Sequence, residues 1–367
     1  MFRLGIIEDY IPRYRAKFFE LLKEKLFEKE VDLRLLSYLP AGTQRARGDY
    51  VKLNFVDDFP QLHAQFGTRS LMFPKSLSKF QNYDALIGSA RGSSFSTHAM
   101  IAHCLKHNKP FGLWGHIRNY VNSDNFLDLL IEKKQMSLAT SIFSYTDSGK
   151  EFGVRQGIDP DKFFVLNNTF DTLELEHELS KVAQHDLNEM IKQYNLYPKK
   201  TVMYIGGLDS SKRIDFLAST LNQIWLINPK IKLLIIGNGE DRYLLDEAVL
   251  RGQVHFLDNS NLQSKAAASR VAKLILMPGR IGLVAVDSIA LGIPIVTTNF
   301  AFHAPEFEYL VEGKSKYTSS LNSPGSYSAL IISLLNQKSS LRFKQDAPSI
   351  DEMVDSFRRG VLRLVRS

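Results

Sequence analysis

The sequence predicts an α/β protein with two doubly wound, Rossmann-like domains. Strand-like apolar runs alternate with helical patterns along most of the chain, which is typical of parallel sheets covered by helices. At 367 residues the chain suits about two domains of ordinary size. The alternation stops at one polar helical stretch, residues 173–200, and then begins again. A polar break of this kind is typical of a linker between domains.

The first half supplies the elements of one sheet. Apolar runs of strand-like composition are followed by segments with helical spacing. We expect strands at residues 2–7, 31–38, 83–89, 110–116, 141–146 and 162–168, and helices at residues 14–28, 127–140 and 147–157, with a further helix around Cys104. These elements form an N-terminal Rossmann-like domain over residues 1–172.

The second half repeats the pattern after the linker helix. We expect strands at residues 201–208, 232–240, 254–258, 272–279 and 293–298, and helices at residues 213–227, 241–251, 261–270 and 283–291. The linker helix and this domain cover residues 173–345. The tail, residues 346–367, carries a helix at 349–365 whose apolar stripe is Met353, Phe357, Val361 and Leu364.

Composition places the chain among globular proteins. Its 44% hydrophobic and 23% charged residues argue against disorder. The single cysteine, Cys104, permits no internal disulfide, which suits a reducing compartment. The N-terminus turns acidic before any long apolar region develops, and no stretch approaches the roughly 18 apolar residues of a spanning helix. We therefore expect a soluble, cytoplasmic protein.

The net charge of +7 lies mainly in the first half, where residues 1–170 carry 23 Lys and Arg against 18 Asp and Glu. Such an excess fits a nucleic acid, an anionic membrane surface or a phosphorylated ligand. No nucleic-acid motif and no aromatic-basic repeat accompanies it. We therefore expect no nucleic-acid partner.

Glycine-rich loops follow three expected strands of the second half, at residues 206–213, 237–240 and 278–283. The third loop opens a helix, whose first free amides attract anions. Gly282 would let a phosphate approach the backbone, Lys212 would supply positive charge, and Asp287 could accept hydrogen bonds from ribose hydroxyls. Each loop alone is also explained by a tight turn. Three such loops in consecutive units favour a phosphate site.

The second half resembles family 4 of the nucleotide-sugar glycosyltransferases, which have the two-domain GT-B fold. "GRIGLVAVDSIALGIPIV" (279–296) is similar to the family's Glu-x7-Glu segment, and "YIGGLDSSKRIDFL" to its diphosphate-binding loop, with Lys212 at the lysine. "LLIIGNGED", "VHFLD" and "FHAPEFEYLVEG" resemble the segments between and after them. In the first half, "IPRYRAKFFELL" and "YTDSGKEFGVRQGIDPDKFFVLNNTFD" resemble stretches of family members. The resemblance implies two domains facing across a cleft, with the tail helix crossing back to the first.

Three positions depart from the family pattern. Gly279 stands at the first glutamate of the motif, and Asp287 stands at the second. Gly207 stands at an arginine that binds the diphosphate. Our hypothesis is that Arg213 or Arg280 replaces that lost cation.

The resemblance implies a donor site in the second domain and an acceptor site in the first. The expected donor-binding residues are Gly206, Gly207, Lys212, Arg213, Gly237, Asn238, Gly279, Arg280, Ile281, Gly282, Leu283, Val284 and Asp287. The expected catalytic residues are His116, Lys212 and Arg213. The expected acceptor-binding residues are Arg13, Arg15, His116, Arg118 and Glu306.

Two of these residues have alternative explanations. His116 ends an expected strand, where a histidine can bind a sugar hydroxyl or move a proton. A structural histidine beside Trp114 and Arg118 is the alternative. Glu306 could bind sugar hydroxyls or cap a helix, since Pro305 precedes it.

No metal and no cofactor are expected, because the sequence lacks an Asp-x-Asp pair after a strand and a histidine cluster with ligand spacing. The expected activity is transfer of a sugar from a nucleotide-diphosphate sugar to an acceptor hydroxyl. The resemblance implies retention at the anomeric carbon and a saccharide or lipid-linked acceptor in polysaccharide synthesis. A non-catalytic nucleotide-sugar-binding subunit and a nucleotide-sugar isomerase are the alternatives.

The amphipathic helix at 14–28 has two possible roles. With the basic first half, its cations fit peripheral contact at the inner face of a membrane. Packing against the core of the first domain is the alternative.

Overall fold

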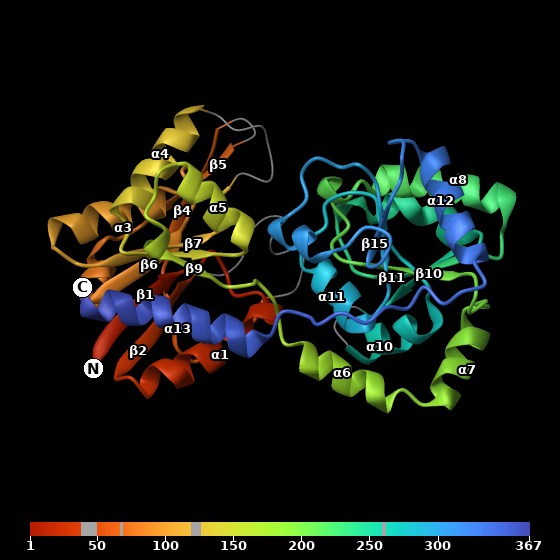
Figure 1. Cartoon of the computed structure of the whole chain (residues 1–367), viewed down its shortest axis with the longest axis horizontal. Helices are drawn as coiled ribbons and strands as arrows, with labels where there is room; N and C mark the ends of the chain where they lie inside the picture. The colour runs from red at the N-terminus through yellow and green to blue at the C-terminus, as the bar shows by residue number, and fades with distance from the viewer. Residues whose placement is uncertain (38–49, 67–68, 119–125, 259–261) are drawn as a thin grey trace. The chain divides into compact units, whose positions relative to one another are not determined.

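The computed structural model describes residues 1–37, 50–66, 69–118, 126–258 and 262–367. The chain forms two compact units (Figure 1). Unit 1 combines Met1–Phe170 with Pro348–Ser367, and unit 2 is Asp171–Ala347. Each unit is built on one parallel sheet, so the predicted pair of doubly wound α/β domains is confirmed.

The sheet of unit 1 has seven parallel strands in the order β3-β2-β1-β6-β7-β8-β9. Its strands are β1 (Phe2–Ile7), β2 (Val31–Ser37), β3 (Val56–Asp58), β6 (Ala85–Ser89), β7 (Phe111–Gly115), β8 (Ser141–Ser144) and β9 (Phe163–Val165). The chain runs outward from β1 to β3 and then returns to the other side of β1. The direction of strand order therefore reverses between β1 and β6.

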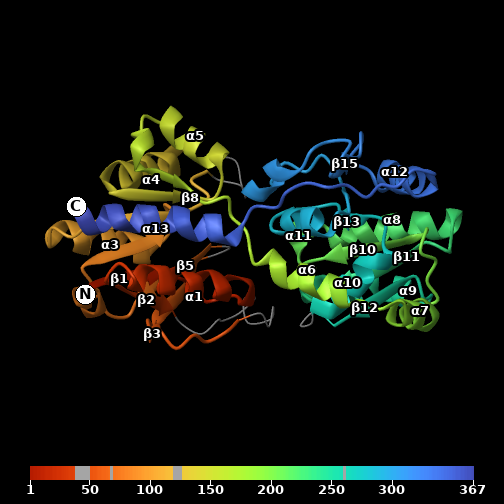
Figure 2. The ribbon, with the colours of Figure 1, turned by 60° about the horizontal axis from the view of Figure 1, so that its bottom comes forward.

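Helices and one hairpin complete unit 1. They are α1 (Arg13–Phe27), α3 (Phe95–Lys106), α4 (Phe126–Leu138), α5 (Asp147–Arg155) and α13 (Ile350–Arg366), the 3-10 turns η1 (Ser78–Asn82) and η2 (Pro160–Lys162), and the antiparallel pair β4 (Gln61–Phe66) and β5 (Arg69–Pro74). Helices α1 and α13 lie side by side (Figures 1 and 2). Strand β3 is not predicted from the sequence, because a strand shorter than four residues shows too little alternation of apolar and polar residues to be recognised.

The apolar stripe of α13 is buried in unit 1, as the sequence pattern predicts. Met353, Phe357, Val361 and Leu364 are each fully buried. The Phe357 ring stacks on Phe143 of β8, with centroids 4.1 Å apart. A buried aromatic side chain of this kind stabilises a core by several kcal/mol. The last helix of the chain is therefore part of the core of unit 1.

Helix α1 also faces this core. Its side chains Phe18, Phe19, Leu22 and Leu26 are fully buried, so the core-packed alternative describes its apolar side. Its exposed residues include both acids and bases, such as Glu20 and Lys17. Among the described residues, no helix is both long and apolar enough to cross a membrane.

The sheet of unit 2 has six parallel strands in the order β12-β11-β10-β13-β14-β15. They are β10 (Thr201–Ile205), β11 (Lys232–Ile236), β12 (Val254–Leu257), β13 (Ile275–Met277), β14 (Ile295–Thr297) and β15 (Lys316–Thr318). The helices are α6 (Thr172–Lys181), α7 (Gln184–Gln193), α8 (Ile214–Ile227), α9 (Asp246–Leu250), α10 (Leu262–Val271), α11 (Val284–Leu291) and α12 (Pro324–Asn336), with 3-10 turns η3 (Ser210–Lys212), η4 (Glu240–Leu245) and η5 (Pro305–Tyr309). Strand order again reverses, here between β10 and β13.

Two predicted helices of unit 2 are wrong in detail. The stretch 173–200 is two helices, α6 and α7, because Val182 and Ala183 are extended. The stretch 241–251 is a 3-10 turn, η4, followed by the five-residue helix α9. Polar composition alone does not distinguish a continuous helix from a broken one.

Candidate functional site

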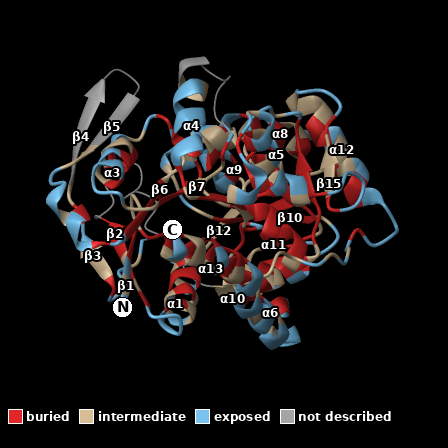
Figure 3. Ribbon diagram, turned by 60° about the vertical axis from the view of Figure 1, so that its left-hand side comes forward, coloured by how far each residue is buried: buried red, intermediate tan, exposed pale blue. Residues whose placement is uncertain are grey.

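The candidate site lies at the carboxyl edge of the unit 2 sheet, where strand order reverses. The loop after β10 and the loop after β13 leave the sheet on neighbouring strands there. In open α/β sheets, ligands bind outside the carboxyl ends of the strands at this reversal. Figure 3 shows β10 and α11 as largely buried elements, so the loops rest on a rigid base.

The two loops touch through their backbones. The Arg280 N–H donates to the Ser211 carbonyl at 2.9 Å, and Lys212 Nζ donates to the Arg280 carbonyl at 2.5 Å. A Cβ atom at Gly279 would lie 2.5 Å from the Lys212 carbonyl carbon and from the Ser211 oxygen. Real Cβ atoms do not approach backbone so closely. Gly279 is therefore required for the contact that holds Lys212 in place.

Gly282 serves a different purpose. A Cβ there would be at ordinary contact distance, 3.5 Å from Ala304 and 3.8 Å from a Glu306 oxygen. The amides of Gly282, Leu283 and Val284 have no hydrogen-bond partner among the residues that the structure describes. These amides open α11, whose dipole adds partial positive charge at this end. The turn therefore has the geometry of an anion-binding element, with its amides not used by the described chain.

Three cationic side chains near these amides differ in burial and in hydrogen bonds. Lys212 and Arg280 are half-buried beside them. Burial lowers the pKa of the Arg280 guanidinium, and nearby Glu306 and Asp209 oppose that shift. Arg213 adopts a left-handed conformation with φ 57°. Its guanidinium donates to Thr298 Oγ1 at 3.0 Å and Asn322 Oδ1 at 2.6 Å.

Those hydrogen bonds bear on the hypothesis that Arg213 or Arg280 replaces the arginine that the resemblance implies at position 207. The Arg213 guanidinium also lies over the Phe216 ring, 4.1 Å from its centroid. These contacts fix the side chain inside unit 2. The Arg280 guanidinium donates to the Phe302 carbonyl at 3.4 Å, and the Arg280 carbonyl accepts from Lys212 Nζ, which places this arginine on the loop that carries the free amides.

His303 supports the same turn and was not singled out from the sequence. The Ile281 N–H donates to His303 Nδ1 at 3.1 Å, and the ring stacks on Phe307 with centroids 3.9 Å apart. Burial, together with Lys316, Lys212 and Arg280, lowers the pKa of His303 to about 4. A neutral ring with an unprotonated Nδ1 is therefore the form that holds the turn.

This depressed pKa predicts a loss of stability in mild acid. Unfolded His303 takes up a proton near pH 6.5, whereas the folded residue does so near pH 4. Between these values the unfolded state binds more protons, so its free energy falls as the pH falls. We expect unit 2 to lose about 2 kcal/mol of unfolding free energy between pH 7.5 and 5 from this residue. Urea unfolding at both pH values measures it.

His303→Asn is the control, because its amide oxygen can still accept from the Ile281 N–H. The variant should lose about 2 kcal/mol less than the parent over the same pH range. Equal losses in the two proteins would contradict the assignment.

The glycines after β10 and β11 pack against each other. A Cβ at Gly237 would lie 1.8 Å from the Gly206 oxygen, and one at Gly239 would lie 2.2 Å from the Leu208 oxygen. Gly206 itself has φ +139°. Gly206 and Gly237 are thus accounted for by backbone packing. A Cβ at Gly207 would lie 3.2 Å from an Asp209 side-chain oxygen, which would have to shift slightly, and Asn238 is exposed.

Asp287 lies one turn into α11 and is buried in an ion pair. Its carboxylate accepts from Lys265 Nζ of α10 at 2.8 Å, and the two side chains are only 8% and 15% exposed. Lys265 was not singled out from the sequence, because nothing in a single chain pairs residues of separate helices. The predicted ribose contact of Asp287 would have to be made by a carboxylate that already holds this lysine.

Removing one partner should destabilise unit 2 strongly. Asp287→Asn leaves a largely buried ammonium without its counter-charge, and we expect a loss of about 3 kcal/mol in chemical denaturation. Combining it with Lys265→Met should restore most of the loss. Glu247→Gln breaks the exposed pair with Arg251, in which Glu247 is 76% exposed, and should cost under about 0.5 kcal/mol. If Asp287→Asn lowers the free energy of unfolding no more than Glu247→Gln does, the Lys265–Asp287 pair does not stabilise unit 2.

The structure brings most of the predicted donor residues together in unit 2. The loops at 206–213 and 278–284 meet directly, and Glu306, predicted for the acceptor, lies beside Gly282 in the same unit. No cluster of three or more His, Cys, Asp and Glu suited to a metal occurs in the described parts of the chain.

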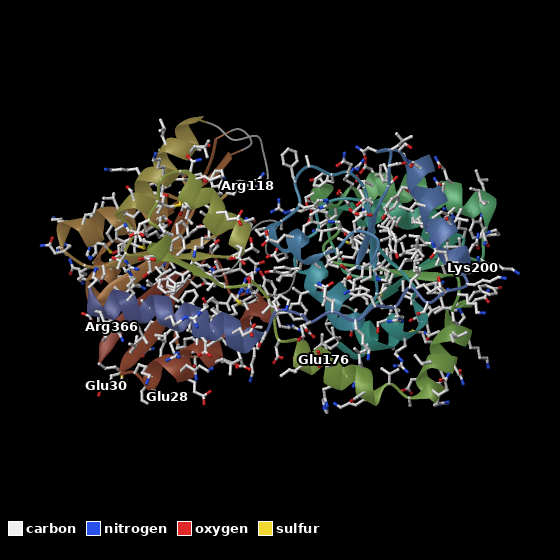
Figure 4. All side chains as sticks on the ribbon, viewed as in Figure 1. Glu28, Glu30, Arg118, Glu176, Lys200 and Arg366 are labelled. Carbon is white, nitrogen blue, oxygen red and sulfur yellow. The ribbon has the colours of Figure 1, made fainter. Side chains whose placement is uncertain are left out.

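The other acceptor candidates lie in unit 1. Arg15 is only 4% exposed, and its Nη1 donates to Asn168 Oδ1 at 2.8 Å. Its guanidinium lies 5.3 Å from the ring centroids of Tyr14 and Trp114, so it is held among core side chains. Arg13 and Arg118 are exposed (Figure 4 labels Arg118). His116 is half-buried, with its ring edge-on to Tyr145 at 4.8 Å.

Comparisons with known proteins agree with this picture. The family model described as glycosyl transferases group 1 matches residues 186–349, which lie mostly in unit 2. A search of curated protein sequences finds no match.

Solved structures of similar fold extend over the whole chain. The UDP-GlcNAc 2-epimerase of Neisseria meningitidis bound to UDP-GlcNAc has a TM-score of 0.65 at 13% identity, covering 99% of this chain and 100% of its own. MnaA of S. aureus with UDP has a TM-score of 0.65 at 11% identity, covering 100% and 98%. Alr3699/HepE of Anabaena with UDP-glucose has a TM-score of 0.63 at 13% identity, covering 100% and 98%. The chain thus has two Rossmann-like domains of the GT-B type.

Proposed function

We propose that this protein is a glycosyltransferase that moves a sugar from a nucleotide-diphosphate sugar to an acceptor hydroxyl. The observation that carries the proposal is the set of uncovered amides at Gly282–Val284 beside Lys212 and Arg280. It lies in the unit that matches the glycosyl transferases group 1 model. The titles of the similar structures name UDP, UDP-glucose and UDP-GlcNAc, so UDP-sugars are the donors to test first.

The site would act on the leaving group. As the acceptor oxygen bonds to the anomeric carbon, the bond from that carbon to the diphosphate breaks and negative charge grows on the phosphate oxygen. The α11 amides and Lys212 stabilise that charge in a preorganised setting. The acceptor proton leaves on the nucleoside diphosphate. Catalysis then rests on positioning and electrostatics, without a metal ion.

Several finer features belong to the same proposal. The transfer retains the anomeric configuration, and unit 1 binds the acceptor, with His116 as a hydroxyl contact. The acceptor is a saccharide or lipid-linked saccharide used for a cell-surface polysaccharide. The protein works in the cytoplasm, with peripheral contact at the inner face of the membrane through the exposed bases of unit 1.

Two alternatives have a specific observation behind them. Glycine at positions 207 and 279 removes two family charges, which favours a nucleotide-sugar-binding subunit without turnover. The fold similarity to an epimerase favours a nucleotide-sugar isomerase, which would change its donor without an acceptor.

One experiment separates these functions. The purified protein is heated with a panel of nucleotide sugars, and the donor that stabilises it is then incubated with membrane-extracted acceptors. We expect acceptor-dependent release of nucleoside diphosphate. Stabilisation without release would support the binding subunit, and conversion of the donor alone would support the isomerase. No stabilisation by any donor would overturn the proposal.

A further inference from the structure

Unit 1 has its own cavity at the point where its strand order reverses. The cavity measures ≈ 50 Å³ and opens beyond the carboxyl ends of β1, β6 and β7. Polar and aromatic groups that line it are Glu8, Asp9, Ser89, Arg91, Trp114 and Tyr145. This is the same topological position in unit 1 that the phosphate-binding turn occupies in unit 2, and it is where such sheets bind ligands.

Two polar groups of the cavity have no hydrogen-bond partner in the described part of the chain. Trp114 is only 6% exposed, and its indole N–H has no acceptor among the described residues. The Glu8 carboxyl group makes neither a hydrogen bond nor an ion pair to any residue that the structure describes. The buried Trp114 N–H without an acceptor costs about 1–3 kcal/mol, whereas Glu8 is partly exposed to solvent. A donor and an acceptor left open in one cavity therefore indicate a ligand group that offers both.

The charges around Glu8 favour a neutral ligand. The positive charges of Arg15 in α1 and Arg91 after β6 lower the pKa of Glu8, whereas the negative charge of Asp9, which follows β1, raises it. Burial raises the pKa of Glu8 to about 7, with Arg15 the main opposing influence. Arg91 lies 3.9 Å from Asp9, so their charges largely offset each other. With Glu8 ionised, the two arginines and the two carboxylates balance, so neither an anion nor a cation gains a net charge partner here.

We propose that this cavity binds one hydroxyl group of a neutral saccharide, whose oxygen accepts from Trp114 Nε1 and whose O–H donates to Glu8. The inference rests on the proposed function for its choice of a saccharide. The volume exceeds the roughly 10–15 Å³ that a cavity needs on this measure to hold one water molecule, which suits one hydroxyl group. One hydroxyl enters while the ring stays outside.

The proposed hydrogen bond to Glu8 gives binding a pH dependence of known direction. A hydrogen bond from the ligand stabilises the ionised Glu8 carboxylate, so affinity rises as pH increases through 7. Hydrogen bonds to charged groups exceed neutral ones by roughly ten-fold in binding. Because the pKa of Glu8 is about 7, both forms are present at pH 6 and at pH 8, and we therefore expect roughly five-fold tighter binding at pH 8 than at pH 6.

Fluorescence of Trp114 tests the inference directly. The chain has two tryptophans, so Trp225→Phe in unit 2 leaves Trp114 as the only one. This variant is titrated with methyl glycosides of glucose, galactose, mannose and N-acetylglucosamine at pH 6 and pH 8. We expect a saturable change with at least one glycoside and roughly five-fold tighter binding at pH 8 than at pH 6. Glu8→Gln should weaken binding and remove that dependence, whereas Glu20→Gln, on the exposed side of α1, should change neither.

Other outcomes overturn the inference. These are no saturable change with any glycoside, an unchanged titration in Glu8→Gln, or saturation by inorganic phosphate instead. Heating with UDP-sugars tests the unit 2 site separately. Donor binding and turnover without a Trp114 response would therefore reject only the cavity, and a Trp114 response without donor binding would reject only the proposed function.

Discussion

Gly279→Ala is expected to lower the melting temperature of unit 2 by about 5–10 °C and to weaken nucleotide-sugar binding. The added Cβ would lie 2.5 Å from the backbone of Lys212 and Ser211, so the two loops have to move apart. Overpacking that shifts backbone costs roughly 1–3 kcal/mol, which corresponds to such a change in a domain of this size. Calorimetry and donor titration measure the two effects.

Gly282→Ala is the matched control, three residues along the same loop. Its Cβ meets only ordinary contacts, so the melting temperature should stay within about 2 °C. Donor affinity should still fall, because the methyl group lies next to the uncovered amides. Equal melting temperatures for Gly279→Ala and the parent would contradict the described contact. The same geometry predicts that Gly279→Glu disrupts the site.

Lys212→Met should weaken donor binding roughly ten- to hundred-fold. The substitution keeps an apolar stem but removes the ammonium group, and a hydrogen bond to a charged group contributes about 1.5–3 kcal/mol. Binding of the nucleoside diphosphate should fall as much as binding of its sugar, since the contact is to phosphate. Isothermal titration with both ligands measures this.

An exposed lysine of the same unit provides the comparison. Lys314→Met removes an equal charge away from the site and should change affinity less than two-fold at physiological salt. Should Lys212→Met behave like Lys314→Met, the diphosphate does not lie against the β10 loop.

The positions of the main strands along the chain were predictable, because each long strand is an apolar run with a following helix. The strands predicted at 2–7 and 201–208 correspond to β1 and β10. The hairpin β4–β5 and helix α12 were not predicted. Helix α12 begins in a Ser-, Pro- and Gly-rich stretch, and such composition is also typical of loops.

The site was predictable only as a set of loops. Glycine after a strand indicates close backbone approach, but the sequence does not say to what. Gly279 meets the neighbouring loop, whereas Gly282 stays open, and only coordinates separate these roles. The Lys265–Asp287 pair and the His303 hydrogen bond join segments about 20 residues apart. No periodicity links such partners.

The course of the chain through α13 has a consequence for biosynthesis. Unit 2 is one continuous stretch, but unit 1 needs the last twenty residues of the chain. The ribosome therefore completes unit 2 before it synthesises Phe357, whose ring packs against Phe18 and Phe143 in unit 1. We expect nascent unit 1 to expose that apolar face until translation ends and to depend on chaperones for that interval. Loss of α13 by premature termination should accordingly cause aggregation, while unit 2 still folds.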